Sequence, residues 1–89
     1  MTQRRMAALW TLDHLARRED FGADIAEMID RSVPADLLPM FEADHRRQRP
    51  GPALELLHRA GMVNWDTFGV FIWLTETGKR VARATNGAQ

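Results

Sequence analysis

The amino-acid sequence predicts one small α+β domain that is mostly helical. Apolar residues recur at spacings of three and four through much of the first 60 positions, which is the period of helices that bury one face. The stretches MVNW and VFIWL that follow are rich in β-branched and aromatic residues and predict two strands. Prolines and glycines fall between these segments, where they end one element and begin the next. We therefore expect residues 1–89 to form a single domain.

The first two helices are predicted from their apolar stripes. A helix over residues 5–18 places four apolar side chains on one face, namely Leu9, Leu12, Leu15 and Ala16. Asp20 is a suitable N-cap for a second helix over residues 23–31, whose stripe consists of Ile25, Met28 and Ile29. Both stripes are expected to face the core.

Prolines divide the next segment. Pro39 would kink a helix that began at Pro34, so we expect a turn over residues 33–38 and a helix over residues 39–47. The side chains of this segment expected to pack inward are Leu37, Leu38 and Phe41. RPGP then interrupts the chain, and a further helix is expected to begin at Pro52 with Gly51 as its cap. This helix is expected to bury Ala53, Leu54 and Leu57.

Gly61 ends that helix, because glycine tolerates the left-handed conformation common at helix C-termini. Residues 62–65 and 70–74 are then expected to pair as a β-hairpin with a tip over residues 66–69. Thr75 fits the N-cap of a last short helix that includes Val81 and Ala82, and residues 85–89 are expected to form a flexible tail. We therefore expect an antiparallel sheet of two or three strands, followed by a short helix.

The second strand of this hairpin is apolar on both faces. Its alternation places Val70, Ile72 and Leu74 on one face and Phe71 and Trp73 on the other. Because only one face can line the core, the second needs a cover: the N-terminal helix, the C-terminal helix or another chain. We expect a dimer or partner contact that involves Trp65, Phe71 and Trp73.

Composition restricts the chemistry. The absence of cysteine excludes disulfides, thiolate metal sites and cysteine nucleophiles. His14, His45 and His58 are too far apart for a local metal-binding motif, and no catalytic motif is present, so we expect neither an enzyme nor a bound cofactor or metal. The longest uncharged run, residues 67–75, is too short to cross a bilayer, and the N-terminus does not resemble a signal peptide. We expect a cytoplasmic protein.

The net charge is zero, but the two halves of the chain differ. Residues 1–44 contain nine acidic and five basic residues, whereas residues 45–89 contain three acidic and seven basic ones. Eleven of the twelve basic residues are arginine, which suits bidentate contacts with phosphate and guanine but also fits a codon bias. The positive half includes the HRRQR run before the Pro52 helix.

The order of four helices, a hairpin and a last helix is that of a winged helix-turn-helix domain. Three segments resemble PadR-type transcriptional regulators. The first, FGADIAEMID, resembles their Gly-then-Ile-Ala segment, and the second, RPGPALELLHRAGMV, is similar to their recognition helix with its closing Gly-hydrophobic-Val. The third, FIWLTETGKRVA, resembles the return strand of their wing, which is the hairpin beside the recognition helix, and its "LT..G" motif. Regulators of the MarR type share the last two features. The resemblance covers about residues 8 to 84.

The resemblance implies a dimeric DNA-binding transcriptional regulator whose helix over residues 52–60 enters the major groove of double-stranded DNA. The side chains that would meet phosphates and bases are Arg46, Arg47, Gln48, Arg49, His58 and Arg59. Three features depart from the family pattern. The long dimerisation helix after Arg83 is missing or short, the wing tip carries Asp66 and no basic residue, and Glu55 lies in the recognition helix.

These departures leave two other functions open. The chain could be a winged-helix module for protein–protein interaction or oligomerisation, such as a phage or accessory factor, that uses its aromatic wing instead of binding DNA. It could also be a regulator that binds a small molecule in an aromatic pocket between the wing and the first helix.

Overall fold

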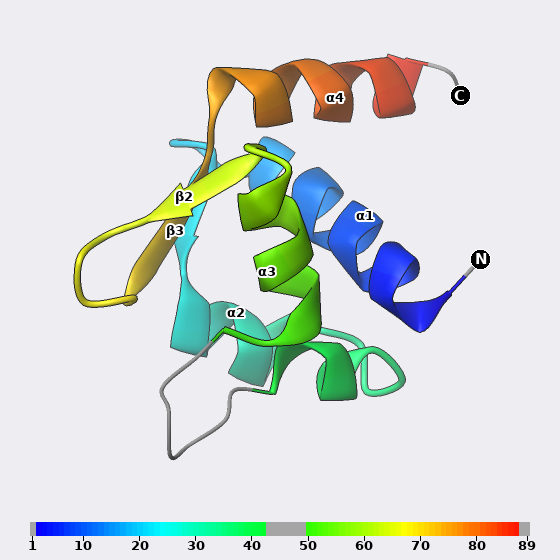
Figure 1. Cartoon of the computed structure of the whole chain (residues 1–89), viewed down its shortest axis with the longest axis vertical. Helices are drawn as coiled ribbons and strands as arrows, with labels where there is room; N and C mark the ends of the chain where they lie inside the picture. The colour runs from blue at the N-terminus through cyan, green and yellow to red at the C-terminus, as the bar shows by residue number, and fades with distance from the viewer. Residues whose placement is uncertain (1, 43–49, 88–89) are drawn as a thin grey trace.

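The computed structural model describes residues 2–42 and 50–87, and these ranges contain four α-helices, one 3-10 helix and three strands (Figure 1). In chain order the elements are α1 (Gln3–Ala16), β1 (Gly22–Asp24), α2 (Ile25–Arg31), the 3-10 helix η1 (Leu38–Phe41), α3 (Pro52–Arg59), β2 (Val63–Trp65), β3 (Phe71–Leu74) and α4 (Glu76–Gly87). This is the mostly helical α+β class that the sequence predicts. The order is also compatible with a winged-helix-like fold.

The three strands form one antiparallel sheet in the order β1-β3-β2, so β3 is central. Residues directly opposite one another in such a sheet point to the same face. Trp65 and Ala23 flank the fully buried Ile72 on the face that lines the core. Gly22 and Asn64 flank Trp73 on the opposite face, which we call the outer face of the sheet.

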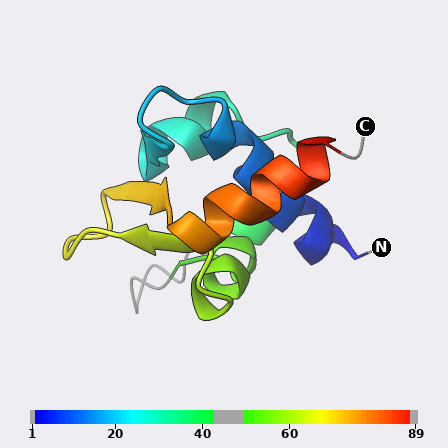
Figure 2. The ribbon, with the colours of Figure 1, turned by 90° about the horizontal axis from the view of Figure 1, so that it is seen from above.

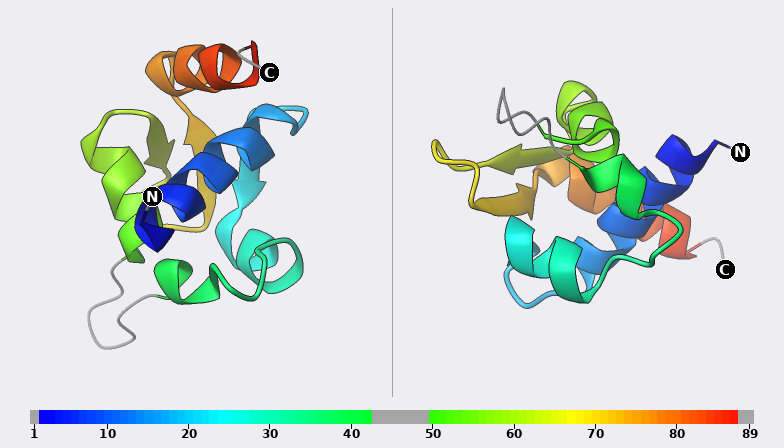
Figure 3. Two further views of the ribbon diagram at one scale, coloured as in Figure 1. Left: turned by 90° about the vertical axis from the view of Figure 1, so that its right-hand side faces the viewer. Right: turned by 90° about the horizontal axis from the view of Figure 1, so that it is seen from below.

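Helix α1 lies in the middle of the fold, with α4 above it, α2 and η1 below it and α3 beside it (Figure 3, left). Because α1 has neighbours on several sides, Ala7, Ala8 and Thr11 are buried as well as the expected Leu12 and Leu15. The buried hydroxyl of Thr11 donates a hydrogen bond to the carbonyl oxygen of Ala7 at 2.8 Å. This polar group is therefore satisfied within its own helix.

The start of α2 differs from the prediction. Residues 22–24 form β1 instead of the first turn of the helix, and the N-cap is Asp24, whose carboxylate accepts the backbone N–H of Glu27 at 3.0 Å. Asp20 is therefore not the cap. Phe21, with a φ of 55°, turns the chain into β1, which extends along β3. Pairing with a strand distant in sequence overrides the weak local preferences of Gly-Ala-Asp.

The segment before α3 also differs from the prediction. The helix expected over residues 39–47 is represented by η1, which ends at Phe41, because Glu42 has an extended backbone with φ −66° and ψ 130°. Residues 43–49 lie outside the described ranges. As expected, Leu37 and Phe41 are buried, while Leu38 is only partly so.

Helix α3 and the hairpin follow the prediction closely. Gly51 is the N-cap of α3, Pro52 is its first residue, and Gly61 has a φ of 74°. A Cβ atom at Gly51 would lie 2.6 Å from the backbone of Phe41, so this glycine also permits a close chain crossing. Val70, expected to begin the second strand, precedes β3 and is 51% exposed.

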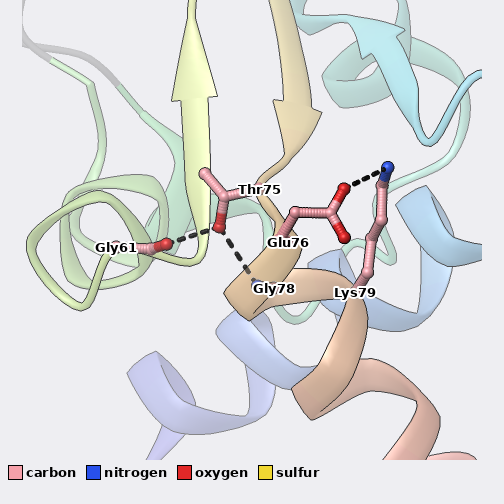
Figure 4. A network of polar contacts seen from close by, with 5 residues as sticks. All are labelled: Gly61, Thr75, Glu76, Gly78 and Lys79. Carbon is pink, nitrogen blue, oxygen red and sulfur yellow. Dashed lines mark hydrogen bonds and ion pairs between the residues drawn. The ribbon is translucent and has the colours of Figure 1, made fainter.

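Thr75 connects the turn after α3 to the start of α4 (Figure 4). Its hydroxyl donates a hydrogen bond to the carbonyl oxygen of Gly61 and accepts one from the backbone N–H of Gly78 at 3.1 Å. Its own N–H donates to the carbonyl oxygen of Met62 at 3.0 Å. Thr75 therefore acts as the predicted N-cap and also holds α4 against the α3–β2 turn.

Helix α4 crosses over α1 when the molecule is seen from above (Figure 2). It buries Ala82 and partly buries Val81, and its helical backbone reaches Gly87, beyond the short helix expected from the sequence. Among residues 2–42 and 50–87, no helix combines the length and apolar character needed to span a membrane.

Candidate functional site

An open hollow of about 360 Å³ lies where α3 meets the hairpin. Residues from both elements and from the segment just before α3 line it, namely Pro50, Glu55, His58, Arg59 and Trp65. The hollow therefore has an aromatic wall, a guanidinium group and a carboxylate within one small area.

The amphipathic pattern of α3 explains which of its side chains reach this hollow. Ala53, Leu54 and Leu57 are buried against the core, so the opposite side of the helix faces outward. His58 and Arg59 are both exposed, as expected from the sequence. They also occupy the last turn, where positive charge is favoured by the helix dipole.

Stacking joins α3 to the hairpin. The rings of His58 and Trp65 lie 4.1 Å apart between centroids, with 24° between their planes. Trp65 lies opposite Ile72 in the neighbouring strand, so its side chain is on the core face of the sheet. There it lies at the edge of the core, beside α3. The stack fixes the spacing between α3 and the hairpin, which makes them one continuous surface.

The charges of the hollow are partly paired. A guanidinium nitrogen of Arg59 lies 2.9 Å from a carboxylate oxygen of Glu55, one helical turn earlier. The side chains are 74% and 42% exposed respectively, so this ion pair contributes little to stability. Its main consequence is electrostatic, because Glu55 reduces the positive charge that Arg59 presents to solvent.

The structure brings together only some of the predicted site residues. His58 and Arg59 lie side by side with Trp65, a residue expected from the sequence to serve a partner contact. Arg46, Arg47, Gln48 and Arg49 lie outside the described residues. Pro50, at the rim of the hollow, directly follows that basic run in the sequence.

Trp65, Phe71 and Trp73 do not form one surface. Phe71 and Trp73 stack on the outer face of the sheet, with centroids 6.5 Å apart and 28° between ring planes, whereas Trp65 follows the core face. A Cβ atom at Gly22 would lie 2.6 Å from the ring of Phe71. Phe71 is 38% exposed and Trp73 is partly buried. The outer face thus carries a two-ring aromatic patch.

The hairpin tip carries an exposed aromatic residue that the sequence did not single out. Phe68 is 88% exposed on a turn whose shape is set by Asp66. One carboxylate oxygen of Asp66 accepts the N–H groups of Val70 at 2.7 Å and Phe71 at 3.3 Å. Its carbonyl oxygen accepts the N–H of Gly69 at 3.0 Å, and Gly69 has a φ of 66°. The sequence Asp-Thr-Phe-Gly is typical of a turn, so it indicates that the side chain of Phe68 points outward.

His14 lies away from this hollow. His14 stacks on Trp10 at 4.8 Å, and burial, followed by the nearby charge of Arg18, lowers the pKa of His14. Within residues 2–42 and 50–87, no group of three or more potential metal-binding side chains lies together.

Comparisons of the chain with protein-family models, with curated proteins and with solved structures gave no match. Function is therefore inferred from the residues and their arrangement.

Proposed function

We propose that this protein is a cytoplasmic winged helix-turn-helix regulator of the PadR-like kind, which binds double-stranded DNA as a dimer through α3 and the adjoining hairpin. The observation that carries this proposal is the His58–Trp65 stack, which joins the outward face of α3 to the hairpin as one surface beside Arg59. A helix that enters the major groove and a second element that contacts the adjacent backbone reach the same duplex from one surface of the protein.

The outward side chains of α3 and the basic run that precedes it support the proposal. An α-helix with its side chains is about 10–12 Å across, which fits the major groove of B-DNA, about 12 Å wide. Arg59 would contact a phosphate or a base edge, and His58 could donate to a phosphate from the ring atoms that the stack leaves free. The run of Arg46, Arg47 and Arg49 precedes α3 in sequence and would supply further phosphate contacts.

A salt-dependent titration tests DNA binding. Fluorescence anisotropy with a random duplex, from about 50 to 200 mM salt, measures the affinity and its slope against salt. We expect the Arg59→Ala variant, and a triple alanine variant of Arg46, Arg47 and Arg49, to bind more weakly, with the slope falling by about 0.9 for each lost phosphate contact. Arg17→Ala removes the same charge outside the hollow and serves as the control. Absence of binding at low salt, or equal loss in the control, would contradict the proposal.

Glu55 gives a second test with the opposite sign. Glu55→Gln removes the carboxylate that pairs with Arg59 and lies in the same hollow. We expect affinity for duplex DNA to rise about two- to fivefold at low salt, because surface charge interactions are worth about 0.5–1 kcal/mol. Glu76→Gln is the matched control, since Glu76 is also an exposed first-turn acid but lies on α4. Unchanged or weaker binding by Glu55→Gln would argue against DNA contact at this surface.

A second candidate function is a protein-interaction module, and the outer face of the sheet favours it. Phe71 and Trp73 form an aromatic patch on a hairpin that carries no basic residue between positions 62 and 75. Such a surface suits an apolar protein partner or a second copy better than it suits phosphate. On this hypothesis the outer face would be covered by the partner.

Replacement of Trp73 by aspartate tests this second candidate. Sedimentation velocity of the wild type, Trp73→Asp and the control Thr77→Asp, an exposed position on α4, compares their assembly states. If the outer face is the interface, Trp73→Asp, unlike Thr77→Asp, should lose self-association. An unchanged assembly state would remove support for an interface on the outer face.

A further inference from the structure

An apolar groove of about 380 Å³ lies between α1, α3 and α4, apart from the hollow beside the hairpin. Its lining is almost entirely aliphatic and includes Leu9, Leu56, Ala60, Met62 and Val81. Arg5 is the one charged residue that lines it among the described parts of the chain. The groove would therefore accept an apolar group that has a negative charge close beside it.

The hairpin tip has the complementary properties. Phe68 is the most exposed large apolar side chain of the described residues, at 88%, and Val70 beside it is 51% exposed. The only charged residue between positions 62 and 75 is Asp66, which belongs to the same turn. The tip thus presents an aromatic ring next to a carboxylate.

The turn is also held in shape before any contact is made. Asp66 accepts three backbone hydrogen bonds within it, two on carboxylate oxygen Oδ1 and one on its carbonyl oxygen. Carboxylate oxygen Oδ2 takes part in none of these three bonds. A side chain presented on a fixed turn loses little entropy on binding, so it can act as an anchor.

The tip and the groove of one chain cannot meet. In Figures 1 and 2 the hairpin projects from the side of the molecule opposite the N-terminal end of α1, which carries Arg5 and Leu9. We infer that the hairpin tip of one copy inserts Phe68 into the α1–α3–α4 groove of a second copy, with Asp66 beside the second copy's Arg5. The occupant of the groove is therefore this chain's own wing.

The proposed contact joins two different surfaces, so it is a head-to-tail contact. It does not rest on DNA binding, because neither Phe68 nor the groove belongs to the hollow beside α3. It is also separate from the outer face of the sheet, where Phe71 and Trp73 lie.

Sedimentation velocity over a range of concentrations tests the contact with one variant on each side. Phe68→Ser removes the ring from the tip, and Phe68→Leu keeps an apolar anchor as its matched control. Ala60→Glu places a charge in the groove at an exposed position, and Ala26→Glu makes the same change on the exposed side of α2. We expect Phe68→Ser and Ala60→Glu each to weaken self-association about tenfold or more, since each removes the burial of one aromatic side chain. Both controls should associate like the wild type.

Mixing the two defective variants identifies the contact itself. Phe68→Ser still has an intact groove and Ala60→Glu still has an intact tip, so the mixture should form a 1:1 pair at concentrations where neither variant associates alone. Circular dichroism melts of each variant establish that all are folded. A wild type that stays monomeric, a Phe68→Ser variant that associates normally, or a mixture that does not pair would each overturn the inference.

Discussion

Gly78→Ala should destabilise the protein strongly, although alanine is the better helix former. Gly78 lies in the first turn of α4, where that helix meets the turn after α3 (Figure 4). A Cβ atom at this position would lie 1.9 Å from the carbonyl oxygen of Met62 and 3.3 Å from Leu74. Cβ atoms essentially never come within 3.0 Å of such a neighbour, so the backbone must move by more than 1 Å.

The displacement breaks identified contacts. The same Met62 carbonyl accepts the N–H of Thr75 at 3.0 Å, and the Thr75 hydroxyl is bonded to Gly61. Loss of these two hydrogen bonds costs about 0.5–1.5 kcal/mol each, and forcing extra volume into a packed contact costs about 1–3 kcal/mol. The gain in helix propensity offsets about 1 kcal/mol. The net expected loss in the free energy of unfolding is about 3 kcal/mol.

Thermal and urea denaturation followed by circular dichroism measure this loss. For a chain of this length, about 3 kcal/mol lowers Tm by about 10–25 °C. Thr77→Ala is the matched control, because it lies in the same helical turn, is exposed and should change Tm by only a few degrees. A Gly78→Ala variant as stable as the wild type would refute the close approach of α4 to the α3–β2 turn.

Two further predictions concern α2 and His14. Asp24→Ala should cost about 1 kcal/mol in urea denaturation, because it removes the cap on the N–H of Glu27, whereas Asp20→Ala should cost almost nothing. If the two losses were reversed, the assigned cap would be wrong. Burial and then the charge of Arg18 hold the pKa of His14 below its ordinary 6.5, so the unfolded chain binds this proton more readily. The stability that His14 contributes is therefore present above about pH 6.5 and is lost as the pH falls through the lowered folded-state pKa. Between pH 7.5 and 5, the Tm of His14→Gln should therefore fall less than the Tm of the wild type.

Local signals were sufficient for much of the fold. Pro52 and Gly51 predicted the start of α3, Gly61 predicted its end, and Thr75 predicted the start of α4. Each of these residues acts through its own backbone conformation or through groups within a few positions, so its effect is encoded locally. The hairpin was likewise predictable from its alternating β-branched and aromatic residues.

The candidate site was only partly predictable. Helical periodicity places His58 and Arg59 on the outward face of α3, and both are exposed. The stack of His58 on Trp65 depends on the packing of the hairpin against α3, which no local pattern encodes. The pairing of Arg59 with Glu55 follows from a spacing of four residues and was available from the sequence.

The sequence by itself therefore determined where α3 begins and ends and where the hairpin and α4 begin, because caps, prolines and alternation act over a few residues. Only the tertiary structure decided that Gly22–Asp24 is a strand, that Asp24 caps α2 and that α1 is buried on several sides. It also decided that Trp65 lies on the core face while Phe71 and Trp73 lie on the outer face. These outcomes depend on which distant segment each residue meets, since strand pairing and core packing are contacts between parts of the chain far apart in sequence.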